Sequence, residues 1–185
     1  MTRMIPVTAG PPFDELLAAA QAGEGWARAR IYEALAPAVA GYARAQGVAD
    51  PADVTSEVFV AVLTGLPAFV GDETGFRRWV FTIAYRRIAD ARRARSRPQA
   101  GPQVDRASPS AEDTTLARLG TQRVEALLAS LTPDQRHVLA LRVIADLSLE
   151  QIADVTGKPL GAVKSLQHRA LCALRRNLAG EAVSR

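Results

Sequence analysis

The sequence predicts an all-α protein with two small helical domains joined by a flexible linker, the second domain containing a helix-turn-helix. Alanine, the strongest helix former, occupies 35 of the 185 positions, and apolar residues recur at the spacing of a helix rather than of a strand. Only 5% of the residues are aromatic, so the core must come mainly from Ala, Leu, Val and Ile. Residues 98–117 contain three prolines and no apolar stripe, which is typical of a linker.

The first domain is expected at residues 13–97, after a flexible tail at residues 1–12 that shows no periodicity. Its helical pattern begins at Phe13 and ends at Gly47. Pro37 lies inside this run and predicts a kink, because proline lacks the N–H that a helix uses. The apolar face of the run is formed by Ile31, Leu35, Val39 and Tyr42.

Two further helices are predicted in this domain. Asp50 is a suitable N-cap and Pro51 a suitable first residue for a helix that Pro67 closes. Thr74 is the expected N-cap of the next helix. The side chains expected to face inward on that helix are Phe76, Val80, Ile83, Ala84, Ile88 and Ala91.

The second domain is expected at residues 118–185. Capping-box sequences at 132–135 and 148–151 mark two helix starts, and the first of these helices is expected to run through Val138, Leu139, Leu141, Val143 and Ile144. Gly157 ends the second, and a last helix runs from about residue 160 to 178. Ala153, Gly157 and Val163 have the spacing of a helix-turn-helix, although an ordinary helical hairpin has similar spacing.

Charge is distributed unevenly along the chain. Eight arginines and one acidic residue give residues 77–97 a net charge of +7, and residues 147–185 carry +3. Residues 1–76 carry −5, so the total of +4 conceals two basic blocks. Two basic blocks separated by acidic ones favour two contacts with an anion such as nucleic acid.

Each basic block contains candidate nucleic-acid contacts. The start of the last helix exposes a polar group without acids, suited to phosphates and base edges: Lys164, Ser165, His168 and Arg169. In the other block, aromatic and basic residues form two rows along the helix, each with seven-residue steps. The first row is Arg78, Tyr85 and Arg92, and the second row is Trp79, Arg86 and Arg93. Such residues can bind a DNA backbone and stack on unpaired bases. Core packing of Trp79 and a solvated helix end remain open alternatives for the second group.

Asp53 and Glu57 form an acidic pair four residues apart, and residues 49–73 contain no Lys or Arg. Like charges at this spacing repel each other, and a basic surface of a partner protein would stabilise them. The alternative is that the pair simply belongs to an acidic face in contact with solvent. The chain has one cysteine and two histidines, too few for a typical metal site, and it shows no set of residues typical of a catalytic nucleophile. We therefore expect no enzymatic activity, no cofactor and no metal site. Without a leader or a long apolar run, a cytoplasmic protein with no membrane insertion is expected.

Several segments together resemble bacterial RNA polymerase sigma factors. The segment DPADVTSEVF at residues 50–59 resembles their core-polymerase-binding helix, and FRRWVFTIA at 76–84 resembles their promoter-melting segment. The segments at 131–139, 147–153 and 161–170 resemble their last DNA-binding domain. The short chain without an intermediate domain is similar to the extracytoplasmic-function (ECF) group.

This resemblance implies a transcription initiation factor that binds core RNA polymerase and promoter DNA and that has an anti-sigma factor as a further partner. Residues 13–97 would be sigma domain 2, in which Asp53 and Glu57 bind polymerase and the basic aromatic helix captures the −10 element. Residues 118–185 would be sigma domain 4, whose Lys164, Ser165, His168 and Arg169 read the −35 element. An autonomous helix-turn-helix regulator is the alternative, and a helical adaptor that binds only protein is a third.

Four positions depart from the pattern of the family. Ser56 stands where the family commonly has Gln, and Arg86 stands at a frequent Asn position. Lys158 and Pro159 replace the usual serine-capped start of the recognition helix. The family pattern therefore does not predict how the helix begins here.

Overall fold

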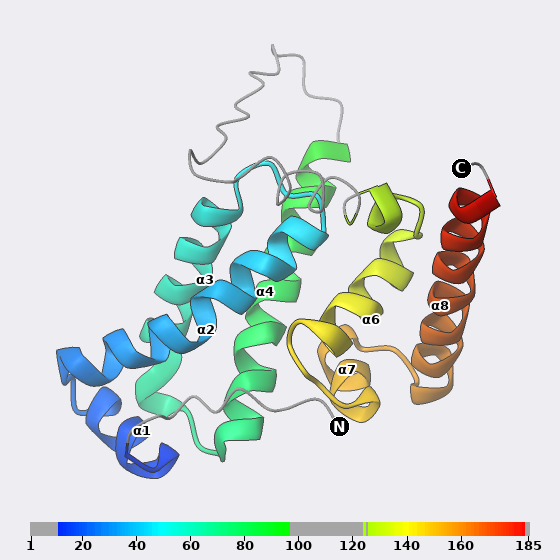
Figure 1. The fold of residues 1–185 in the computed structure, drawn as a ribbon. Helices are drawn as coiled ribbons and strands as arrows, with labels where there is room; N and C mark the ends of the chain where they lie inside the picture. The colour runs from blue at the N-terminus through cyan, green and yellow to red at the C-terminus, as the bar shows by residue number, and fades with distance from the viewer. Residues whose placement is uncertain (1–10, 97–123, 125, 184–185) are drawn as a thin grey trace.

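The computed structural model describes residues 11–96, 124 and 126–183, and the regular structure in these ranges is entirely helical (Figure 1). The predicted linker and nearly all of the predicted tail lie outside the described residues. The first domain contains α1 (Phe13–Gln21), α2 (Gly25–Ala45), α3 (Pro51–Gly65), a 3-10 turn η1 (Leu66–Ala68) and α4 (Glu73–Ser96). The second contains α6 (Pro133–Val143), α7 (Leu149–Thr156) and α8 (Leu160–Val183).

Local side-chain chemistry sets the starts of α3 and α4 in the first domain. Asp50 caps α3 as predicted, because its Oδ1 accepts the backbone N–H groups of Ala52 and Asp53 at 3.1 and 2.9 Å. The predicted cap at Thr74 is wrong. Asp72 takes this role, since its Oδ1 accepts the Gly75 N–H at 2.7 Å and α4 has already begun at Glu73.

The core of the first domain lies between α2, α3 and α4. Tyr42, Phe76 and Phe81 are among the largest fully buried side chains, and the rings of Tyr42 and Phe81 meet edge to face at 5.8 Å. Pro37 lies inside α2, and the helix continues past it to Ala45. The proline therefore does not end the helix, and buried residues on both sides of it, Leu35 and Val39, pack into the core.

The second domain follows the predicted capping pattern. Thr132 with Gln135, and Ser148 with Gln151, form complete capping boxes at the starts of α6 and α7. Gly157 ends α7 in the left-handed conformation, with φ of 67°. Val143 is the last residue of α6 and is 67% exposed.

The two domains pack against one another, which the sequence pattern does not indicate. One continuous apolar core runs from Leu16 and Tyr42 in the first domain to Leu141 and Ile152 in the second. Helix α7 packs against both α4 and α8, α6 packs against α2 and α8, and α8 forms the outer edge of the molecule (Figure 1). We call this packing of α6 and α7 against α2 and α4 the closed arrangement.

Candidate nucleic-acid and protein interfaces

The acidic pair lies on the open face of α3. Asp53 and Glu57 are both exposed, and Val60 continues the same helix face with a side chain that is 66% exposed. Carboxylates beside exposed apolar side chains form a surface suited to a protein partner with basic and apolar groups.

A groove between α2 and α3 adjoins this acidic face. It has a volume of about 390 Å³. Tyr32, 45% exposed, lines the groove and packs its ring against Phe59 at 4.7 Å. The remaining lining residues are Glu33, Ala36, Pro37, Ala40, Ala52, Thr55 and Ser56. A shallow groove with mainly apolar walls can accept a side chain or a helix of another protein.

The first row of predicted −10 contacts, Arg78, Tyr85 and Arg92, runs along the side of α4 that faces the second domain. Arg78 Nη1 lies 2.9 Å from Asp154 Oδ2 of α7. The ring of Tyr85 meets the ring of His137 of α6 edge to face at 5.0 Å. In the closed arrangement the second domain therefore contacts a row that the sequence predicts to contact DNA, and Arg78 stays exposed.

The second row behaves differently. Trp79 is half-buried in an aromatic cluster with Phe69 and Phe76, at ring distances of 5.1 and 5.6 Å. Gly65 allows this position, because a Cβ there would lie 2.8 Å from Trp79 Cζ2. Arg86 is exposed, and the side chain of Arg93 lies outside the described part of the chain. The packing of Trp79 is the core role that the sequence left open.

A buried hydrogen bond joins the two domains beside the first row. The Tyr42 hydroxyl oxygen lies 2.7 Å from His137 Nδ1, and both residues are buried. Burial, and then the nearby Arg92 guanidinium, lower the pKa of His137 to about 4. Burial raises the pKa of Tyr42 well above the usual value of about 10, so both rings are uncharged at neutral pH.

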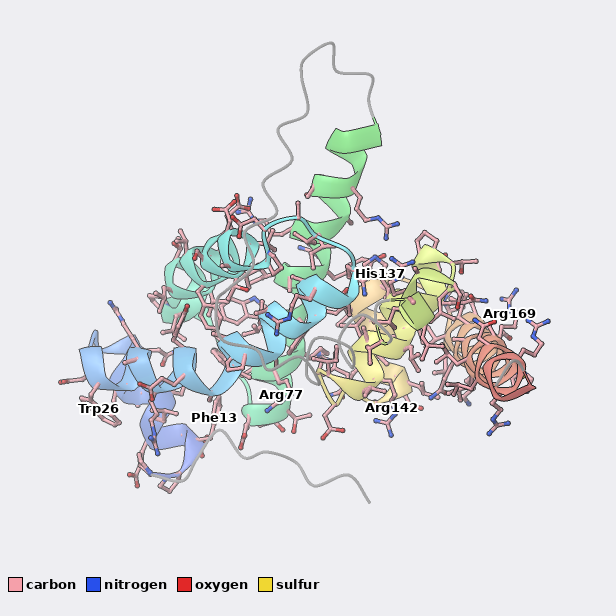
Figure 2. All side chains as sticks on the ribbon, turned by 45° about the horizontal axis from the view of Figure 1, so that its top comes forward. Phe13, Trp26, Arg77, His137, Arg142 and Arg169 are labelled. Carbon is pink, nitrogen blue, oxygen red and sulfur yellow. The ribbon has the colours of Figure 1, made fainter. Side chains whose placement is uncertain are left out.

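The helix-turn-helix presents its second helix to solvent. Lys164, Ser165, His168 and Arg169 are all exposed near the start of α8, and Arg169 points outward at the edge of the molecule (Figure 2). The Arg169 Nε donates to the Ser165 carbonyl at 3.2 Å, which orients the guanidinium along the helix. Four polar side chains thus share one accessible face.

The unusual start of α8 has a simple structural basis. The Pro159 carbonyl accepts the N–H groups of Ala162 and Val163 at 2.9 and 3.1 Å, which needs no side-chain cap. Lys158 Nζ forms an ion pair with Asp134 Oδ2 at 2.9 Å and so ties the turn to α6. Lys158 and Pro159, which depart from the family pattern, therefore stabilise the turn between α7 and α8.

Comparison with known proteins identifies the family. The family model Sigma-70 region 2 matches residues 31–98, and Sigma-70, region 4 matches residues 127–176. The chain is 34% identical over 177 residues to the ECF RNA polymerase sigma factor SigD of Mycobacterium tuberculosis (strain ATCC 25618 / H37Rv), covering 90% of this chain and 84% of SigD. The chain belongs to the ECF sigma factors. It is therefore a transcription initiation factor that directs RNA polymerase to promoters.

Two further relatives support this sigma factor's assignment. The ECF sigma factor BldN of Streptomyces coelicolor is 34% identical over 175 residues, covering 91% of this chain and 66% of BldN. A solved structure of CnrH in complex with the cytosolic domain of CnrY superposes with a TM-score of 0.68 at 28% identity, over 90% of this chain and 96% of CnrH. The fold similarity therefore extends over both domains of the sigma factor.

The interdomain residues were missed by sequence reasoning. Tyr42 was expected only as one member of an apolar stripe, and neither His137 nor Asp154 was singled out. Within the described residues no helix is both long and apolar enough to span a bilayer, and no group of three or more potential metal ligands is present. Contacts between distant helices, rather than a local motif, are what single out these three residues.

Proposed function

We propose that the sigma factor divides promoter recognition between α4 and α8 while α3 holds core polymerase. Helix α4 contacts the −10 element, α8 reads the −35 element, and Asp53 and Glu57 contact the polymerase surface. The observation that carries this assignment is the shared exposed face of four polar residues on α8, directly after the Gly157 turn. No acidic residue lies between 155 and 180 to repel DNA phosphates.

The side chains on α8 have the chemistry for major-groove readout. Lys164 and Arg169 can donate to phosphates or to guanine edges, for which arginine is the commonest partner. The Ser165 hydroxyl donates to the Gly161 carbonyl at 2.9 Å, so its oxygen is left to accept from a base amino group. The combination supports both positioning on the backbone and discrimination between bases.

The α3 face supports a protein contact and not catalysis. Its carboxylates adjoin exposed apolar residues and a groove with apolar walls. Nucleotide chemistry belongs in this scheme to the polymerase, and the cytoplasm, where polymerase acts, is the expected location. The sigma factor supplies recognition alone, without a cofactor.

A protein inhibitor is the second proposed partner. The similarity to CnrH, solved with the cytosolic domain of CnrY, supports a partner of this type. Once isolated and purified, the partner should lower transcription by the reconstituted holoenzyme in proportion to its concentration. A partner that binds the sigma factor and leaves transcription unchanged contradicts an inhibitory role.

The −35 assignment is tested by measuring how tightly the holoenzyme binds a promoter that has been mapped in cells expressing the sigma factor. Lys164→Ala and Arg169→Ala should each weaken promoter binding by the holoenzyme by about 1–3 kcal/mol, while core binding stays unchanged. Arg44→Ala, an exposed arginine on α2, is the matched control. Equal promoter binding by all three variants and the parent contradicts the assignment.

The core contact is tested separately by measuring affinity for core polymerase. Asp53→Asn with Glu57→Gln should lower this affinity and make it less sensitive to salt, because two charges are lost at equal size. Glu15→Gln, an exposed acid on α1, is the control for charge loss. Full retention of affinity and salt dependence removes the proposed role of the pair.

The autonomous regulator remains distinguishable by experiment. Such a protein binds operator DNA without polymerase. It would not need a domain similar to Sigma-70 region 2, which this chain has at residues 31–98. Tight binding to a double-stranded promoter by the sigma factor alone, unchanged by core polymerase, would favour that alternative.

A further inference from the structure

Polar side chains enter the core of the sigma factor beside the Tyr42–His137 hydrogen bond. His137 lies where α2, α4 and α6 meet (Figure 2). Gln46 follows Tyr42 by four residues and keeps a helical backbone, so it lies one turn further along the same face of α2. At the next residue, Gly47, an added Cβ would lie 3.9 Å from Arg136 Nη1. The end of α2 therefore contacts the first turn of α6.

Gln46 is buried without a hydrogen-bond partner. The residue is only 3% exposed, and neither its Nε2 nor its Oε1 has a partner among the described residues. Unmatched buried polar atoms are costly, and an apolar side chain of the same size would avoid that cost. A ligand that accepts a hydrogen bond from the amide nitrogen and donates one to the amide oxygen would satisfy both atoms.

Arg136 presents a buried donor at the same place. Its Nη2 donates to the carbonyls of Ala129 and Leu131 at 3.4 and 3.2 Å, whereas its buried Nε has no acceptor in the described part of the chain. Burial, and then the charge of Arg92 on α4, lower the pKa of Arg136. We call Gln46, Arg92 and Arg136 the junction cluster.

The charge at the junction is positive. Among the charged groups that act on His137, three are cations, Arg92, Arg136 and Lys158, and one is the carboxylate of Asp134. That carboxylate is already engaged, because Asp134 Oδ2 lies 2.9 Å from Lys158 Nζ. The two guanidinium groups therefore dominate the local field, and an anion between α2, α4 and α6 would reduce the repulsion between them.

The unmatched atoms indicate which anion fits. Gln46 Nε2 and Arg136 Nε each need an acceptor, and Gln46 Oε1 needs a donor. Chloride and sulfate only accept hydrogen bonds at neutral pH. Hydrogen phosphate accepts through its charged oxygens and also keeps one O–H that can donate. Because all three protein atoms are buried, the anion must be small.

We propose that the junction cluster is a binding site for free inorganic phosphate, which links α2 and α4 of the first domain to α6 of the second. Bound phosphate accepts hydrogen bonds from Gln46 Nε2 and Arg136 Nε, and its O–H donates to Gln46 Oε1. Its charge offsets the repulsion between Arg92 and Arg136. The site does not depend on the proposed −10 role of Arg92.

Binding is tested by equilibrium dialysis of the full chain against radiolabelled orthophosphate at neutral pH. We expect a single phosphate per chain and binding of sulfate that is weaker by about tenfold or more. Gln46→Leu and Arg136→Gln should each weaken phosphate binding by about tenfold or more, because each removes a hydrogen bond to a charged group. The matched controls are Gln167→Leu on α8 and Arg44→Gln on the exposed side of α2, which should bind as the parent does.

Urea unfolding distinguishes a ligand site from a structural role of Gln46. With phosphate at ten times its dissociation constant, the unfolding equilibrium constant of the parent should fall about elevenfold compared with chloride at equal ionic strength. Gln46→Leu should show no such difference. In chloride this variant should be at least as stable as the parent, since it removes unmatched buried polar atoms.

Four results overturn the proposal. One is the absence of phosphate binding by the parent. Another is full binding by Gln46→Leu and Arg136→Gln, which would indicate an adventitious ion only, held on a basic surface. A third is displacement of phosphate by AMP, whose nucleoside is too large for a buried site. The last is an equal loss of stability by Gln46→Leu in phosphate and in chloride, which would indicate a structural role alone.

Discussion

Acidification should separate the two domains through His137. The pKa of this imidazole is about 4 in the closed arrangement because of burial and the Arg92 charge, against about 6.5 for an exposed histidine. The opened or unfolded chain therefore binds a proton below pH 6.5 that the closed form does not bind until about pH 4. The contribution of His137 to the stability of the closed form is fully present above pH 6.5 and is lost as the pH falls from 6.5 to about 4.

The size of the effect follows from the two pKa values. At pH 5.0 the unfolded histidine is almost fully protonated and the buried one is mostly neutral, so the closed form loses about 2 kcal/mol relative to pH 7.5. Burial is the largest cause, and the charged or titratable groups that act on the ring are placed on three sides of it. They are Tyr42 from α2, Tyr85 and Arg92 from α4, and Asp134, Arg136 and Lys158 from α6 and the turn after α7.

The assay is urea unfolding at pH 7.5 and pH 5.0. Between these pH values the parent protein should lose about 2 kcal/mol more than His137→Gln, which has no titrating group at this position. The comparison removes the contribution of carboxylates, because both proteins share them. His168→Gln on exposed α8 is the control and should follow the parent. The same pH dependence in His137→Gln and the parent refutes the reasoning.

Three further substitutions have expected outcomes in the same unfolding assay at pH 7.5. Tyr42→Phe should cost about 1–2 kcal/mol, because it leaves buried His137 Nδ1 without its partner; an unchanged midpoint would mean that the bond contributes nothing. Asp50→Ala should cost about 1 kcal/mol through the loss of the α3 cap, and Asp50→Asn should recover most of it. Gly65→Ala should cost about 1 kcal/mol net, since the clash with Trp79 Cζ2 exceeds the gain in helix propensity, whereas Gly161→Ala, which has open space, should not destabilise the chain.

Features set by a few adjacent residues were predictable from the sequence. The Asp50 cap, the two capping boxes and the left-handed Gly157 depend on groups within about four positions of one another. The single local error is instructive: Asp72 and Thr74 can both cap a helix, and the sequence does not say which side chain reaches a free N–H. The structure decides for Asp72, whose carboxylate binds Gly75 at 2.7 Å.

The interdomain contact could not be predicted in this way. Tyr42 and His137 are 95 residues apart, and an apolar stripe shows that a face is buried without showing what buries it. Trp79 illustrates the same limit within one domain. Its packing depends on the missing side chain of Gly65 and on the ring of Phe69, both brought to it by the turn after α3. The roles of the −10 and −35 residues stay predictions that the binding experiments address.

Pro37 removes one main-chain hydrogen bond from α2 where this helix forms a wall of the groove. A proline at this position has no N–H, so the carbonyl of Glu33, one turn earlier, receives no helical hydrogen bond from it. Glu33 and Pro37 both line the groove between α2 and α3. A residue with an amide proton at position 37 would supply the missing helical hydrogen bond, so Pro37 changes the main chain of this wall as well as its surface.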